Sequence, residues 1–150
     1  KLVQIMRRLV VLLALITPPA IAEVHLDSAW VRALPPTQPV TAAYLSVMNH
    51  GNSAVSVTGA RVEGAGRVEI HTSREVDGLM TMEQITSLDI APGQTVSLEP
   101  GGAHLMLFDI DAMPQPGETR SLCLQFASGE EACIGAEVRK TAMTDAHQHH

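Results

Sequence analysis

Between residues 23 and 140, short stretches in which apolar and polar side chains alternate are separated by breaks rich in Gly, Pro, Asn and Asp. Alternation with a period of two is typical of strands with one buried face, and no long stretch shows the apolar period of an amphipathic helix. Regularly spaced short strands predict a single all-β domain, an antiparallel sandwich or barrel, without an internal repeat. The stretches expected as strands are 24–33, 41–49, 55–60, 67–73, 79–86, 95–99, 103–110, 119–126 and 132–139.

The first 22 residues differ in composition from the rest. Met6 is followed by two arginines, an apolar run over residues 9–16 and a small-residue end at Ala22. This layout is typical of a secretory signal peptide (1–22) that is cleaved after Ala22, with the five residues before Met6 extra to it. The run is shorter than the ~20 residues that span a bilayer, so an uncleaved anchor is the less favoured alternative. We expect a periplasmic protein without stable membrane insertion after cleavage, with a β domain (23–140) and a flexible tail (141–150).

The charge of the chain bears on its partners. Cleavage would remove Lys1, Arg7 and Arg8 and leave seven basic against 16 acidic side chains, a formal charge of −9. Such a surface repels phosphate backbones, so nucleic acid is not expected as a partner. We find no Ser/His/Asp arrangement, no Gly-rich phosphate loop and no close pair of carboxylates with a role, and we therefore do not expect an enzyme.

Two cysteines, Cys123 and Cys133, flank a segment that reads as a hairpin. In the register of that hairpin they are directly opposite each other, at a distance that allows a disulfide. The exported setting favours the oxidised form. The alternative is a free thiol pair that binds metal or performs redox chemistry, but the spacing is not C-x-x-C and gives no support to a thioredoxin-like role.

Two histidine–methionine pairs lie off the apolar stripes of their strands. In the hairpin of residues 68–85, His71 and Met82 occupy the face opposite the apolar one, and a four-residue loop over 75–78 would make them direct cross-strand neighbours. His104 and Met106 are two residues apart on one strand and so share a face. Taken singly, each has an ordinary explanation as a surface histidine or a gap-filling methionine. Together they predict a site with two imidazole nitrogens and two thioether sulfurs.

The donor types indicate the metal. Thioether sulfur is soft and uncharged, which suits Cu(I) and makes it a poor ligand for calcium, magnesium or zinc. Structural zinc sites use Cys, His or carboxylates. A Cu(I) site on a sheet surface or edge would allow ligand exchange with a partner, as a carrier requires.

The sequence also resembles a known family. The spacing is His71, ten residues, Met82, 21 residues, His104, one residue and Met106, and it is accompanied by AWVRALPP, AAYLSVMNHG, EIHTS, GLMTM, LEPGGAHLML and GETRSLCLQF. These features are similar to those of the periplasmic copper chaperones called PCu(A)C, over nearly all of residues 27–140. The resemblance implies a cupredoxin-like Greek-key β-sandwich or barrel and Cu(I) held by these four side chains. It also implies delivery to a copper-accepting protein, either the copper centre of a haem–copper (cytochrome c) oxidase subunit or another copper chaperone. The cysteine pair is not part of the family pattern.

The C-terminal tail is rich in imidazole, with His147, His149 and His150. Imidazole suits Cu(II), so we hypothesise a second, weaker Cu(II) site there; a solvated tail with incidental affinity is the alternative. Met80 shares a face with Met82 and is a candidate spare ligand, although packing is the simpler role. The sequence indicates no partner for Met48, His50 or Met113, and Trp30 and Tyr44 are expected in the core.

Two other functions compete with the carrier. An electron-transfer cupredoxin would need a Cys thiolate among the copper ligands, in a Cys–His–Met run near the C-terminus. Neither cysteine lies in such a run. A metal-free exported β-sandwich that serves as an interaction domain would explain the fold but not the paired ligands.

Overall fold

The computed structural model describes residues 23–141, which form ten strands. No helix is present within that range, and so there is no helix that could cross a bilayer among the described residues. The expected signal peptide (1–22) and most of the tail, with His147, His149 and His150, lie outside the described residues. The strands are β1 (Val24–Arg32), β2 (Thr41–Asn49), β3 (Val55–Val62), β4 (Ala65–Val76), β5 (Leu79–Ile85), β6 (Leu88–Ile90), β7 (Thr95–Leu98), β8 (His104–Ile110), β9 (Thr119–Phe126) and β10 (Glu131–Arg139).

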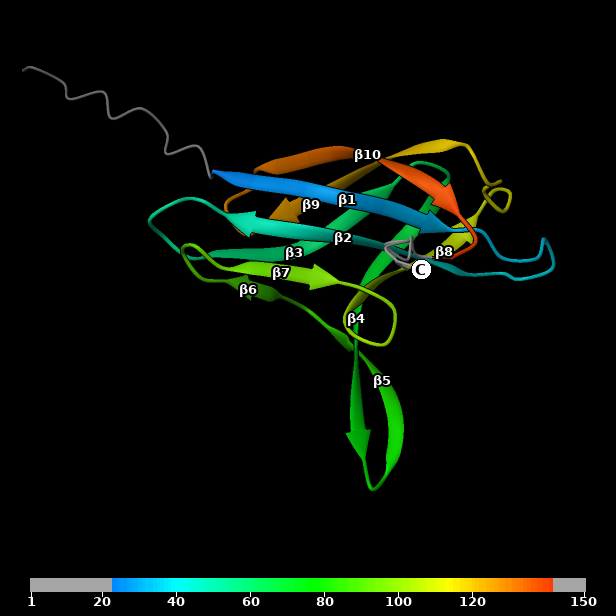
Figure 1. Ribbon diagram of the computed structural model, residues 1–150, viewed down its shortest axis with the longest axis horizontal. Coiled ribbons are helices and arrows are strands. Elements are labelled where there is room, and N and C mark those ends of the chain that lie inside the picture. The colour runs from blue at the N-terminus through cyan, green and yellow to red at the C-terminus, as the bar shows by residue number, and fades with distance from the viewer. Residues whose placement is uncertain (1–22, 142–150) are drawn as a thin grey trace, which may run out of the picture.

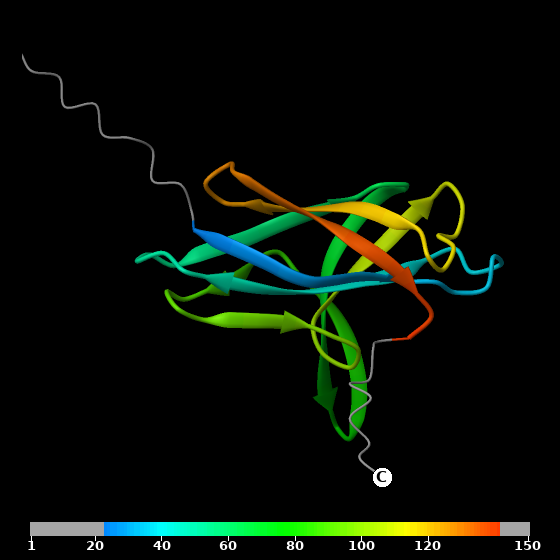
Figure 2. The same ribbon diagram turned by 45° about the horizontal axis from the view of Figure 1, so that its top comes forward.

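The strands form one hydrogen-bonded path in the order β5-β4-β8-β2-β1-β10-β9-β3-β6, and β7 pairs with β2 beside it. All pairs are antiparallel except β1 with β10, which is parallel. The path folds back on itself around the core, and the β4–β5 hairpin projects from the body (Figures 1 and 2). The all-β prediction is confirmed, and each expected strand is present with small shifts at its ends. The three-residue β6, which pairs with β3, was not expected because it is too short to show alternation.

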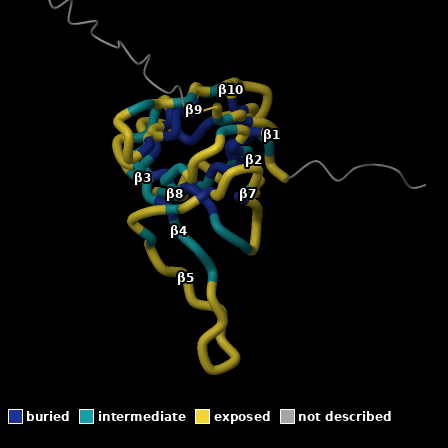
Figure 3. The backbone as a smooth tube through the Cα atoms, turned by 90° about the vertical axis from the view of Figure 1, so that its left-hand side faces the viewer, coloured by how far each residue is buried: buried dark blue, intermediate teal, exposed yellow. Residues whose placement is uncertain are grey.

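The alternating apolar side chains build the core. Leu105 and Leu107 of β8 are fully buried, as is Leu45 of β2. Full burial of an aliphatic side chain of this size contributes about 1.5–3 kcal/mol. Figure 3 shows the buried segments gathered in the body and the exposed ones over the outer part of the β4–β5 hairpin. The core therefore fixes one face of β4 and β8 and leaves the opposite face free for other uses.

The turn of the β4–β5 hairpin corrects one prediction. Asp77 and Gly78 alone connect the strands, with φ of 52° and 78°. An Asp-Gly pair with both φ positive matches a two-residue turn whose twist suits the flanking strands, so the expected four-residue loop was wrong. Met82 therefore opposes Ser73, and His71 opposes Gln84. A shift of two residues leaves Met82 on the face of His71, but diagonally displaced from it.

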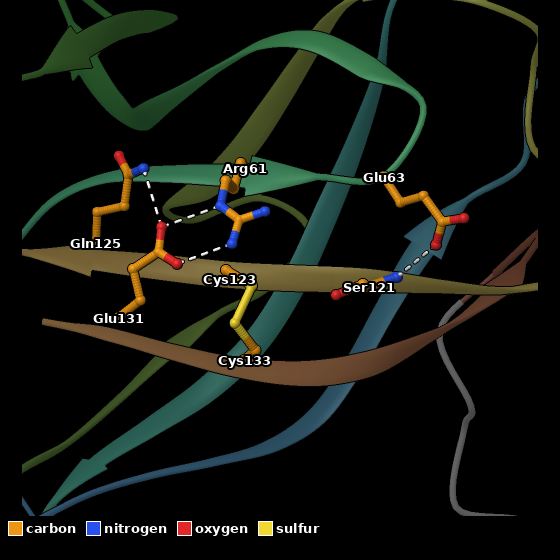
Figure 4. The surroundings of a disulfide bond; sticks show 7 residues. All are labelled: Arg61, Glu63, Ser121, Cys123, Gln125, Glu131 and Cys133. Carbon is orange, nitrogen blue, oxygen red and sulfur yellow. Dashed lines mark hydrogen bonds and ion pairs between the residues drawn. A yellow bond between two sulfur atoms is a disulfide. The ribbon is translucent and has the colours of Figure 1, made fainter.

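Cys123 and Cys133 are direct partners of β9 and β10, as the hairpin register predicts, and they form a disulfide with Cα atoms 4.0 Å apart. Beside them, Arg61 donates through Nε (3.0 Å) and Nη2 (2.8 Å) to the two carboxylate oxygens of Glu131 (Figure 4). The two sulfurs and the Glu131 carboxylate lie within 4.8 Å of one another. Because the sulfurs are bonded to each other and the carboxylate is held by Arg61, this group offers no thiolate to a metal ion.

Candidate metal centre

The register of β4, β8 and β2 brings three of the predicted ligands onto one face of the sheet. His104 is the direct partner of His71 across the β8–β4 pair. Met106 lies between Glu69 of β4 and Ala42 of β2. The alternate residues of β8 are buried in the core, so these candidate ligands occupy the opposite face.

A pocket of roughly 310 Å³ opens on this face. Met82, His104 and Met106 line it together with Ser73, the cross-strand partner of Met82. Met82 comes from the projecting hairpin and is 55% exposed. His71 is not part of the pocket wall, but its ring centroid is 5.8 Å from that of His104. The structure thus gathers Met82, His104 and Met106 at one pocket and places the fourth predicted ligand, His71, beside His104.

His104 is buried, and its ring orientation is fixed by the backbone. Its Nδ1 lies 3.1 Å from the carbonyl oxygen of Gly102. A carbonyl oxygen only accepts hydrogen bonds, so Nδ1 carries the proton and donates it. In the neutral ring the lone pair is then on Nε2, which is the form in which a histidine binds a metal.

His71 is held by a carboxylate. Its Nε2 donates to Oε2 of Glu69 at 2.8 Å, and Glu69 also forms an ion pair with Arg67. Burial lowers the pKa of His71 below its usual 6.5, and the positive charge of Arg67 lowers it further. Arg67 thus offsets the charge of Glu69, and the His71–Glu69 contact is a hydrogen bond that the neutral ring donates to the carboxylate at pH 7. The remaining nitrogen, Nδ1, is buried without a hydrogen-bond partner.

The unpaired Nδ1 of His71 indicates whether these residues fit a metal ion. A buried acceptor without a partner costs about 1–3 kcal/mol, and a metal ion would satisfy it. The other donors are the His104 Nε2 and two thioethers, all neutral, and the pocket wall contains no carboxylate. Within residues 23–141 the only convergent group of three His, Cys, Asp or Glu side chains is the one at the disulfide. The donor set therefore fits soft Cu(I) and not a hard cation.

Trp30, Arg32 and Tyr44 belong to the same face, which sequence reasoning did not recognise. Trp30 and Tyr44 are cross-strand partners with rings stacked 4.5 Å apart. Both are buried, as expected, on the side of the sheet opposite the main aliphatic cluster, and Tyr44 lines the pocket with Arg32. Burial raises the pKa of Tyr44, and Arg32 offsets part of that effect. The sequence feature that could have revealed Tyr44 at this site is the alternation in β2, which puts Tyr44 on the face opposite the buried Ala43.

Arg32 differs from the other described arginines, each of which forms an ion pair with a carboxylate. Arg32 has none within residues 23–141, and its Nε is buried without a hydrogen-bond partner. Its guanidinium carbon lies 5.3 Å from the ring centroid of Tyr44. The wall of the pocket thus carries a permanent positive charge.

Met80, the candidate spare ligand, is not placed at the pocket. It opposes Glu75 near the hairpin tip and is 65% exposed. The pocket wall contains Met82 but not Met80, although both lie on the same face of β5.

Comparison with known proteins assigns this chain to a family. The model of the LpqE-like family, described as "Putative lipoprotein LpqE-like", matches residues 24–138. The chain belongs to this family. It is 32% identical over 117 residues to the "Putative lipoprotein Lxx21020" of Leifsonia xyli subsp. xyli, covering 77% of this chain and 69% of that protein.

Solved structures confirm the fold. The "Solution structure of CuI-DR1885 from Deinococcus Radiodurans" is 29% identical with a TM-score of 0.62, over 77% of this chain and 76% of that one. The "Copper-bound PCuAC domain from PmoF2" is 22% identical with a TM-score of 0.65, over 80% and 95% of the two chains. At this lower identity the likeness shows the fold alone, and the predicted cupredoxin-like β fold is confirmed.

Proposed function

We propose that this LpqE-like protein is a copper chaperone of the cell envelope that binds Cu(I) through His71, Met82, His104 and Met106. The observation that carries the proposal is the pairing of His71 and His104 on the sheet face that presents Met106, beside a pocket that Met82 lines from the hairpin. Each histidine has one nitrogen engaged by protein and the other without a partner in the described residues.

The charges favour the monovalent ion. Four neutral donors leave the single charge of Cu(I) uncancelled, and the nearby Arg32 guanidinium repels a divalent ion more strongly than a monovalent one. The same donors contain no thiolate that an oxidising compartment could convert to a disulfide. The site therefore suits Cu(I) outside the cytoplasm.

The exposed Met82 provides a route for release. A ligand on a projecting hairpin with little burial is displaced at small structural cost, so a partner's donor could replace its sulfur while the two histidines still hold the ion. This is the behaviour of a carrier and requires no catalytic group. The recipient that the sequence resemblance implies is a copper-accepting protein, either the copper centre of a haem–copper oxidase or another copper chaperone.

The comparisons support the proposal at a coarser level. The Deinococcus radiodurans relative is described in a Cu(I) form, and the Leifsonia relative is described as a lipoprotein, which is consistent with export to the cell envelope. The electron-transfer alternative is disfavoured because both cysteines are consumed by the disulfide, which leaves no thiolate among the described residues for a blue-copper site.

The test is competition for Cu(I) with a chromogenic chelator such as bathocuproine disulfonate under anaerobic conditions. The wild-type chain should retain the first equivalent, and His104→Gln and Met106→Leu should each weaken its affinity at least about tenfold, the lower end of what even indirect changes at metal sites cost. Ser73→Ala alters the wall of the same pocket without removing a donor and serves as the control. Equal affinity in all four proteins would refute the ligand assignment.

Delivery needs its own measurement. Cu(I)-loaded protein is mixed with the apo form of a soluble copper-accepting oxidase domain, the two are separated, and copper is measured in each. Transfer should be complete within the mixing time at equimolar concentration. If this chain retains its copper, the result would contradict a chaperone role and indicate copper storage instead.

A further inference from the structure

A second group of imidazole and thioether side chains lies at the other end of β1 and β2. His25 and Met48 are direct cross-strand partners. His50 follows the last residue of β2, and its ring centroid is 6.2 Å from that of His25. The start of β1 and the end of β2 lie together at one end of the body in Figure 1. The sequence showed no partner for Met48 or His50, and the register supplies His25.

The three side chains face away from the core. The neighbouring pair Leu26 and Val47 is buried, so His25 and Met48 project from the opposite face, with Cβ atoms about 4.5–5.5 Å apart as in any direct cross-strand pair. Both histidines are exposed and Met48 is half-buried. The backbone N–H of His50 donates to the carbonyl oxygen of Glu23 at 2.8 Å, which fixes His50 beside the start of β1.

The separation of the rings suits one shared ion. With metal–nitrogen bonds of about 2.0 Å, each ring centroid lies about 3.2 Å from the metal, so two bound rings have centroids about 5.2 Å apart at a tetrahedral angle and about 6.4 Å apart when opposed. The observed 6.2 Å for His25 and His50 falls within this range, as does the 5.8 Å of His71 and His104. Neither ring of the second pair has a hydrogen-bond partner within residues 23–141, so their nitrogens are not committed elsewhere.

We propose that His25, Met48 and His50 form a second Cu(I) site. Two imidazoles and one thioether repeat the donor chemistry of the first site, and soft sulfur selects Cu(I) over zinc or a hard cation. Met48 lies six positions along β2 from Ala42, which adjoins the first site, a distance of about 20 Å at the rise of a strand. The two sites share no ligand, so the second does not depend on the first.

The experiment is an anaerobic Cu(I) titration of the full chain labelled with ¹³C at the methionine methyl groups and followed by NMR. The methyl signal of Met48 should shift as the second equivalent is added. The double variant with His25→Gln and His50→Gln should weaken that response at least tenfold. Met48→Leu provides an independent test. In this variant the ring signals of His25 and His50 should respond to Cu(I) at least tenfold more weakly than in the wild-type chain.

His71→Gln separates this proposal from the proposed function. This variant should weaken Cu(I) binding at the first site and leave the response of the Met48 methyl signal unchanged. The two site assignments can therefore be tested independently of each other. The exposed positions of His25 and His50 predict that their variants melt within about 2 °C of wild type, because surface changes alter stability by little. A Met48 methyl that stays unmoved at two equivalents of Cu(I), or that moves equally in the double histidine variant, overturns the proposal.

Discussion

Replacing Met82 by alanine should separate metal binding from folding. Met82 is 55% exposed, so less than half of its side chain is withdrawn from water. Full burial of a methionine is worth about 1.5–3 kcal/mol, so its truncation should cost about 1 kcal/mol or less and lower the melting temperature by about 4 °C or less. Loss of one of four donors should weaken Cu(I) binding at least about tenfold, because even changes to groups that only support a ligand cost that much.

Met80→Ala is the matched control. Met80 has the same chemistry, lies two residues away on the same face of β5 and is 65% exposed, but it does not line the pocket. Its removal should leave Cu(I) affinity within about twofold, with a similarly small change in melting temperature. Met82→Leu adds a variant that keeps the volume and removes the sulfur, and it should lose affinity as the alanine variant does.

The assay is chelator competition for Cu(I) in parallel with thermal unfolding followed by circular dichroism. Equal affinities of the Met80 and Met82 variants would refute the assignment of Met82 as a ligand. Unfolding of the Met82 variant would instead show that this side chain serves the fold, contrary to its exposure.

Replacing both Cys123 and Cys133 by alanine should lower the free energy of unfolding, measured in urea, by about 3 kcal/mol, the chain-entropy value for a loop closed across ten residues; an unchanged midpoint would contradict this. The pKa of Glu131 is held at about 2, below the ordinary 4.5, first by hydrogen bonds from Arg61. Because the folded-state pKa is depressed, this carboxylate stabilises the fold at neutral pH, and the contribution is lost as the pH falls from 4.5 through about 2. Wild type should therefore melt above Glu131→Gln at pH 7 and together with it near pH 2, whereas a constant gap would show another cause. Deleting residues 141–150 should lower Cu(II) stoichiometry and leave Cu(I) affinity unchanged, and equal Cu(II) stoichiometry would reject the tail site.

The faces of the strands could be predicted from the sequence because side-chain direction follows a strict period of two. Alternation placed His71, His104 and Met106 opposite the core, where the structure has them. The predicted register of the hairpin was wrong because a four-residue loop was expected, whereas Asp77 and Gly78, both with positive φ, form a two-residue turn. The error changed which residues are opposite and not which face they share.

The surroundings of the candidate site could not be predicted, since they depend on contacts between distant segments. The burial of His104 and the hydrogen bond to Gly102 require the loop before β8 to fold over the ring. The pocket needs β1 and β2 to bring Arg32 and Tyr44 beside β8. The partner of His50 is 25 residues earlier in the chain, and only the β1–β2 register reveals it.

X-ray absorption at the copper edge of the protein loaded with one equivalent of Cu(I) tests the central claim most directly. The account predicts nitrogen and sulfur neighbours in equal number, two of each, with the sulfur component reduced in Met82→Ala and unchanged in Met80→Ala. A first shell of nitrogen and oxygen alone, or a sulfur component that survives the loss of both Met82 and Met106, would contradict it.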